Sequence, residues 1–213
     1  MANNDSPKGL VPIRHRNGAP YTGSANPYYI NSGYGTALFI GDPVIKVAGG
    51  SNTAAITTNA GNFGSTFPIG TLPEIEKSSA GDTSRITGVI VGFYSLATDQ
   101  ETKHSKASTE GVALVCDDPD VIHEIQADGA VPALSMGLNA NLIFTHNGST
   151  VTGLSGVELD TTSDVPAVDA SNPLLILRAI NRIDNDTTLT HAKVEVMINQ
   201  HTQNQGTVGT AGI

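Results

Sequence analysis

Hydrophobic and polar residues alternate with a period of two in several short segments, and no segment sustains the 3.6-residue period of an amphipathic helix. The alternation is clearest in residues 190–201, where small or aliphatic side chains occupy every second position from 192 to 198. We predict a strand there, with one face in the core and the other facing solvent or a partner. Residues 174–177 are continuously apolar, which is typical of a strand covered on both faces.

Turn-forming residues predict two hairpins. Residues 111–116 and 121–126 are strand-like runs on either side of an acidic, proline-containing turn, and together they indicate a hairpin rather than a helix. Asn147-Gly148 is the strongest two-residue hairpin signal in the chain, and it predicts pairing between the segments on either side of it.

Other segments complete the expected elements. Residues 86–94 are the best candidate for a buried strand, and the two glycines within them indicate a bulge or the close approach of another backbone. The turn at residues 41–43 predicts a hairpin or a corner. Residues 59–84 are rich in Gly, Ser and Pro, which predicts a long loop, and residues 132–138 allow a turn or two of helix.

The N-terminal segment, residues 1–33, contains four prolines and four glycines, too many for a long helix or a central strand. We predict an extended N-terminal arm over 1–33, a β-sandwich or barrel body over 34–201 and a flexible C-terminal tail over 202–213. Full burial of each larger apolar side chain in the arm is worth roughly 1.5–3 kcal/mol, so we expect these side chains to be covered by protein. The predicted partner-binding residues are Leu10, Val11, Ile13, Arg14, Arg16, Tyr21, Tyr28, Tyr29 and Ile30.

Two alternatives remain open for the arm, which either packs across its own domain or reaches a neighbouring subunit.

For the body, short strands separated by turns predict an all-β fold, an antiparallel β-sandwich or barrel that is jelly-roll-like. Composition agrees with many turns, because aromatic residues make up only 5% of the chain and charged residues 15%, against about 25% in average domains.

Charge is distributed unevenly. The net charge is −9 overall, and residues 1–33 carry three basic groups and one acidic group, a balance of +2, which leaves −11 on the rest. An acidic body repels phosphate backbones, so we expect no direct nucleic-acid partner. No stretch approaches the roughly 18 apolar residues of a membrane span, and the N-terminus lacks a signal-peptide core, so we expect no membrane partner and synthesis in a reducing cytoplasm.

Candidate chemistry is sparse. The single cysteine, Cys116, excludes an internal disulfide, and its apolar surroundings predict an inert thiol rather than a nucleophile paired with His123. Asp117, Asp118 and Asp120 could ligate Ca²⁺, but a solvated acidic turn is favoured, with a metal- or carbohydrate-binding domain kept as an alternative. His191 and His201 lie too far apart on one strand to share an ion. We therefore predict that the protein is not an enzyme and that it has no catalytic residues, metal ligands or cofactor.

Several segments carry a resemblance to a known group of proteins. They are residues 9–15 (GLVPIRH), 37–44 (ALFIGDPV), 85–93 (RITGVIVGF), 113–120 (ALVCDDPD) and 126–129 (QADG). In them the chain resembles virion structural proteins of tailed bacteriophages, in particular capsid decoration or cement proteins.

The resemblance implies a β-rich fold, often trimeric, that lies on the outer surface of the capsid and whose termini extend over neighbouring capsomers. It implies the major capsid protein as the partner, and synthesis in the host cytoplasm. A neck, tail or head-fibre component is the alternative within the same particle. The resemblance supplies no catalytic residues.

Overall fold

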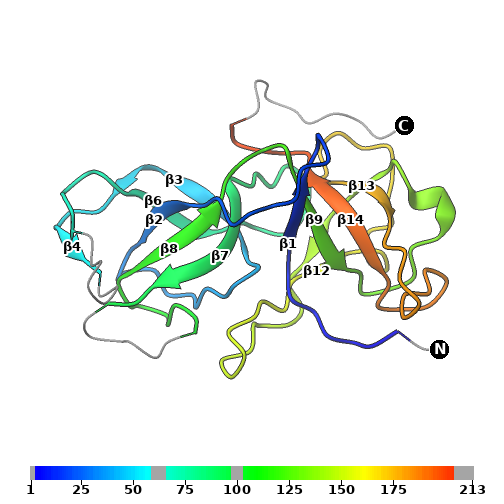
Figure 1. Ribbon diagram of the computed structural model, residues 1–213, viewed down its shortest axis with the longest axis horizontal. Coiled ribbons are helices and arrows are strands. Elements are labelled where there is room, and N and C mark those ends of the chain that lie inside the picture. Colours follow the sequence, from blue (N-terminus) through cyan, green and yellow to red (C-terminus); the bar gives the residue numbers. More distant parts are fainter. Residues whose placement is uncertain (1–2, 59–65, 97–102, 204–213) are drawn as a thin grey trace.

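The computed structural model describes residues 3–58, 66–96 and 103–203, and the chain forms two β lobes joined side by side (Figure 1). One is a closed barrel with strand order β2-β6-β3-β7-β8, and the other is built on a five-stranded sheet with order β1-β9-β14-β13-β10. The predicted all-β class is therefore confirmed. No helix among the described residues is long and apolar enough to cross a membrane.

The barrel lobe contains five longer strands and one small flap. The barrel strands are β2 (Asn26–Ile30), β3 (Pro43–Ser51), β6 (Pro73–Lys77), β7 (Gly88–Tyr94) and β8 (Gly111–Cys116). The flap pairs β4 (Ile56–Thr57) with β5 (Thr66–Phe67). Aliphatic side chains and Tyr28 fill one barrel core, while Tyr29 and Val112 form a second apolar cluster with the flap residue Ile56.

The sheet lobe contains the remaining strands and the helical turn. They are β1 (Val11–His15), β9 (Val121–Gln126), β10 (Asn139–Ala140), β11 (Leu142–Ile143), β12 (Glu158–Leu159), β13 (Leu174–Ala179), β14 (Lys193–Ile198) and a 3₁₀ turn, η2 (Ala133–Ser135). The alternation predicted for residues 190–201 is confirmed, because Val194, Val196 and Ile198 are at most 1% exposed. Ile86 and Val89 of the barrel lobe join the same core, so apolar contact connects the two lobes.

The N-terminal segment is not a separate arm, and this corrects the predicted division of the chain. Strand β1 pairs with β9 from Val11↔Glu124 to His15↔Val121, at the edge of the five-stranded sheet. Strand β2 closes the barrel by pairing with β8 and β6. Prolines at positions 12 and 27 are tolerated because β1 is an edge strand and β2 pairs with β6 only at Tyr29. The predicted body over 34–201 is likewise divided between the two lobes.

Both predicted hairpins are wrong. Strands β8 and β9 lie where expected, but β8 pairs within the barrel and β9 pairs with β1 and β14, so the acidic turn between them connects the lobes. Strand β11 pairs with β12 rather than across Asn147-Gly148. The short apolar runs identified the strands, but long-range pairing determined their partners.

The structure contradicts the predicted long loop and confirms the predicted bulge in β7. The long loop predicted over residues 59–84 is interrupted by β6, a strand of the barrel. In β7 the register shifts between Ile90 and Gly92, and a Cβ at Gly88 would lie 2.3 Å from the Cys116 carbonyl oxygen, so the predicted bulge and close approach are confirmed. Of the predicted tail, residues 204–213 lie outside the described part, and Thr202 N–H donates to the Ile86 carbonyl.

Candidate functional site

Four of the predicted partner-binding residues lie inside the protein's own cores. Leu10, Tyr28, Tyr29 and Ile30 are at most 3% exposed. Leu10 joins the sheet-lobe core, and the other three belong to the barrel clusters. For these residues the structure shows packing against the same chain, the first of the two alternatives left open, so they cannot contact a partner in the folded state.

The other predicted partner-binding residues keep accessible surface, but the two arginines are already paired. Arg14 donates to Glu195, which also accepts two hydrogen bonds from Arg178, and Arg16 lies 3.9 Å from Asp120. Burial acts to raise the pKa of Glu195, but the hydrogen bonds from the two arginines outweigh it and hold the pKa below its usual range. The excess positive charge counted in the N-terminal segment is thus largely neutralised within the chain.

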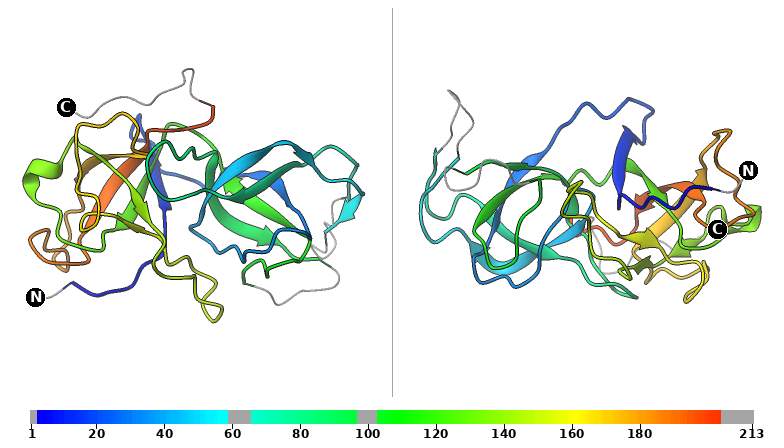
Figure 2. Two further views of the ribbon diagram at one scale, coloured as in Figure 1. Left: turned by 180° about the vertical axis from the view of Figure 1, so that it is seen from behind. Right: turned by 90° about the horizontal axis from the view of Figure 1, so that it is seen from below.

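The β1–β2 connection, residues 16–25, is the most accessible part of the N-terminal segment. It runs from the sheet lobe to the barrel lobe and forms an outer loop of the molecule (Figure 2, right). Its conformation is held by backbone hydrogen bonds from His15 N–H to Ala19 O and from Tyr21 N–H to Ile13 O, while the Tyr21 hydroxyl donates to Ser24 O. The loop therefore presents a defined surface that includes Arg16 and part of Tyr21.

The acidic turn between the lobes directs its three carboxylates to different partners. Asp117 accepts hydrogen bonds from Asn26 and from the Tyr28 hydroxyl. Asp118 lies 3.3 Å from His15 Nδ1 and also accepts from a backbone N–H, and Asp120 faces Arg16. These contacts fasten the inter-lobe link to the N-terminal segment, and they do not converge on a common cation or sugar position.

Cys116 and His123 do not form a nucleophile and base pair across a hairpin, because β8 and β9 belong to different sheets. Burial raises the pKa of the Cys116 thiol to about 11, only partly offset by a hydrogen bond with Tyr21. His123 is fully buried, on β9 between β1 and β14. Burial and the neighbouring His201 lower its pKa to about 3, against a smaller opposing effect of the Val121 backbone.

His123 predicts a loss of stability in mild acid. The unfolded histidine takes up a proton near pH 6.5, while the folded one stays neutral until about pH 3, so the unfolded state binds more protons in this window. Because the unfolded histidine is only half protonated at pH 6.5, the loss reaches the full slope of about 1.4 kcal/mol per pH unit only at lower pH, and His123 removes about 2.3 kcal/mol of folding free energy between pH 6.5 and pH 4.5. In His123→Leu this contribution should vanish, which urea unfolding at both pH values, followed by circular dichroism, would measure. His123→Gln is the polar control without titration, and an equal fall with pH in wild type and both variants would contradict the prediction.

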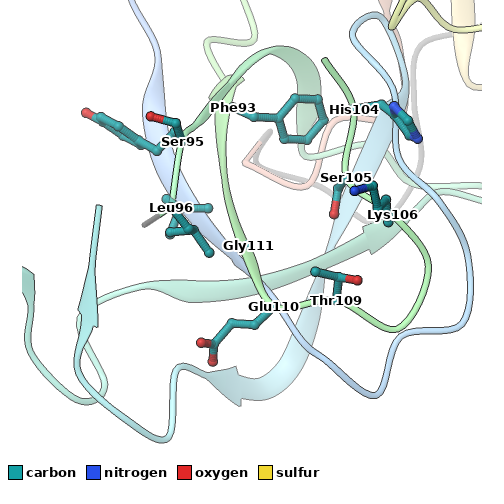
Figure 3. Close-up of a pocket in the computed structure, with 11 residues that line it drawn as sticks. Phe93, Ser95, Leu96, His104, Ser105, Lys106, Thr109, Glu110 and Gly111 are labelled. Atoms are coloured by element: carbon teal, nitrogen blue, oxygen red, sulfur yellow. The ribbon is translucent and has the colours of Figure 1, made fainter. Parts of the chain in front are cut away.

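A small pocket lies in the barrel lobe between the end of β7 and the loop before β8 (Figure 3). Its volume is about 40 Å³, which holds a water molecule or two but none of the ligands that occupy cavities of roughly 300 Å³ and more. His104, Lys106 and Glu110 line it, and the Glu110 carboxylate is directed away from the other two. Glu110 instead accepts a hydrogen bond from Tyr29.

One group of potential metal ligands was missed in the sequence. The ligand atoms of Asp5, Glu158 and His191 all lie within 4.8 Å of one another, and His146 Nδ1 is 3.6 Å from the second oxygen of Glu158. The residues come from four separate parts of the sheet lobe, so no motif spacing could have identified them. The tertiary fold brings them together, with Gln126 on β9 bridging Asp5 and Glu158.

Comparisons with protein-family models, with curated proteins and with solved structures find nothing that matches this chain.

Proposed function

We propose that this chain is a non-enzymatic virion structural protein that binds the outer surface of a phage capsid shell and stabilises it. The observation that carries the proposal is the exposed, internally hydrogen-bonded β1–β2 connection, which spans two lobes that are held together by a shared apolar core. A rigid two-lobed body with a preformed outer loop suits attachment to a repeating surface, because little conformational entropy is lost on binding. The sequence resemblance to decoration proteins supports the same function.

Attachment would use the accessible residues of the N-terminal segment, Val11, Ile13, Arg14, Arg16 and Tyr21, against neighbouring major capsid proteins. A stable contact needs about 800 Å² on each partner, more than one loop supplies, so a self-associated trimer at a symmetry site is part of the proposal. Three linked copies then bind with an avidity well above that of each contact. The four core residues Leu10, Tyr28, Tyr29 and Ile30 are outside this proposed surface because the fold buries them.

Co-sedimentation with assembled shells of the phage that encodes the chain tests the proposal. Wild-type protein should pellet with the shells at a copy number in the hundreds per particle, whereas a neck, tail or head-fibre component would be present in a few copies at one site. Arg16→Glu combined with Tyr21→Ala should raise the dissociation constant for shells at least tenfold, because both side chains lie on the outer loop and about 1.4 kcal/mol of lost contact corresponds to a factor of ten in affinity.

The matched control is Ile69→Ser, which changes another exposed side chain, 67% accessible, in the connection between β5 and β6 of the barrel lobe. It should bind as wild type does, and circular dichroism should confirm that both variants are folded. Failure of the wild-type protein to bind shells would overturn the proposed function. Normal binding by the double variant would instead remove the β1–β2 connection from the contact surface.

A further inference from the structure

Three side chains from distant parts of the sequence meet on the surface of the sheet lobe. Asp5 belongs to the N-terminal segment, Glu158 to β12, and His191 to the turn before β14. His191 Nδ1 lies 3.6 Å from Asp5 Oδ1 and 4.0 Å from Glu158 Oε1. These separations are too long for hydrogen bonds, so the three groups face one another without a direct bond.

The separations fit a small divalent cation between the groups. Bonds from Zn²⁺ to imidazole nitrogen and carboxylate oxygen are about 2.0–2.2 Å long, so tetrahedral ligand atoms lie about 3.3–3.5 Å apart. The nitrogen-to-oxygen distances in this cluster exceed that by only a few tenths of an ångström, a gap that small side-chain rotations would close. Residues Asp5, Glu158 and His191 therefore provide three of four tetrahedral positions.

The carboxylates are held in place by a buried glutamine. Gln126 Nε2 donates to Asp5 Oδ1 at 3.0 Å and to Glu158 Oε1 at 2.8 Å. Its own oxygen accepts from Ser6 N–H at 3.0 Å, which fixes the amide orientation so that the NH₂ group faces the acids. Outer hydrogen bonds of this kind orient the ligands in protein metal sites.

Two features of the cluster favour binding of a cation between the three side chains. The Glu158 side chain is only 4% exposed, and none of its contacts within the described residues is with a lysine or arginine. His191 Nδ1 is buried without a hydrogen-bond partner. A bound cation would satisfy the nitrogen and both carboxylates at once.

We propose that Asp5, Glu158 and His191 bind a divalent transition-metal ion, with Zn²⁺ as the probe. Mixed nitrogen and oxygen ligands favour such an ion over Ca²⁺ and Mg²⁺, which take oxygen ligands. His146 lies nearby, with its Nδ1 3.6 Å from the other oxygen of Glu158, and it borders a cavity of about 250 Å³ together with Asp5. The ion would fasten the N-terminal segment to β12 and to the turn before β14. This role is independent of capsid binding.

Calorimetric titration of the full, untagged chain with Zn²⁺ tests the proposal. One ion per chain should bind and raise the thermal unfolding midpoint. His191→Ala should weaken the affinity at least 100-fold, because a ligand is lost. Gln126→Ala should weaken it 10- to 100-fold, as losses of outer-shell partners do. Ca²⁺ and Mg²⁺ should bind far more weakly than Zn²⁺.

His15→Ala is the matched control, because His15 also faces an aspartate, at 3.3 Å from Asp118, but belongs to no three-ligand group among the described residues. It should bind Zn²⁺ as the wild type does. Asp5→Asn tests the same site from the N-terminal segment if His191→Ala does not fold. The absence of stoichiometric Zn²⁺ binding by the wild type, or unchanged affinity in folded His191→Ala or Asp5→Asn, would overturn the proposal.

Discussion

Replacing Asp42 by alanine should lower the free energy of unfolding by about 3–5 kcal/mol, the cost of removing one member of a buried ion pair. Asp42 is fully buried immediately before β3, and its carboxylate lies 2.9 Å from Lys77 Nζ. It also accepts hydrogen bonds from the Ser155 hydroxyl at 2.6 Å and from Phe39 N–H at 2.8 Å. Alanine would leave a nearly buried ammonium, a hydroxyl and a backbone N–H without their acceptor.

Smaller changes at the same place separate the contributions. Asp42→Asn keeps the size and an acceptor oxygen but loses the charge that faces Lys77, so its cost should be intermediate. Ser155→Ala removes one hydrogen bond and should cost about 1 kcal/mol. Urea unfolding followed by circular dichroism gives all three values, since the chain has no tryptophan. A loss below about 1 kcal/mol in Asp42→Ala would show that the lysine is well solvated without its partner.

Local patterns in the sequence predicted where strands occur better than they predicted which strands pair. The alternation in β14 and the aliphatic run in β8 depend on each strand's own side chains, and both elements were found. The partner of β8 depends on β2, where Pro27 and the other prolines of residues 1–33 favoured an extended arm over a strand. Pro27 is accommodated because β2 pairs with β8 along its length but with β6 at a single position.

For the candidate sites, too, features set by neighbouring residues could be predicted, and features set by long-range contacts could not. Burial of the Cys116 thiol could be predicted, because it ends the aliphatic run of residues 112–115. The cluster of Asp5, Glu158 and His191 could not, because none of the three is adjacent to another potential ligand and all three lie outside the five-stranded sheet. Burial of Leu10 also depended on a contact that is not local, the crossing of the N-terminal segment over the corner before β3.

Gly41→Ala should also lower the free energy of unfolding strongly, because Gly41 lies where the N-terminal segment crosses the corner before β3. Gly41 has a φ of 95°, and a Cβ there would lie 1.9 Å from the Lys8 carbonyl oxygen. Gly9 is equally confined, since its Cβ would lie 2.2 Å from the Gly41 carbonyl oxygen, which accepts a hydrogen bond from Leu10 N–H. Alanine at position 41 therefore adds backbone strain of about 1–2 kcal/mol to overpacking of about 1–3 kcal/mol, a loss of about 2–5 kcal/mol.

Gly18→Ala separates the two terms, because Gly18 has a similar φ of 91° with nothing within 4 Å of the added Cβ. It should cost only the strain, about 1–2 kcal/mol. Urea unfolding compares the variants, and hydrogen exchange at Leu10 N–H shows whether Gly41→Ala displaces the N-terminal segment. Equal losses in the two variants, with Leu10 still protected, would mean that the crossing relaxes easily. Faster exchange at Leu10 would show that close backbone contact at two glycines keeps the N-terminal segment against its own body.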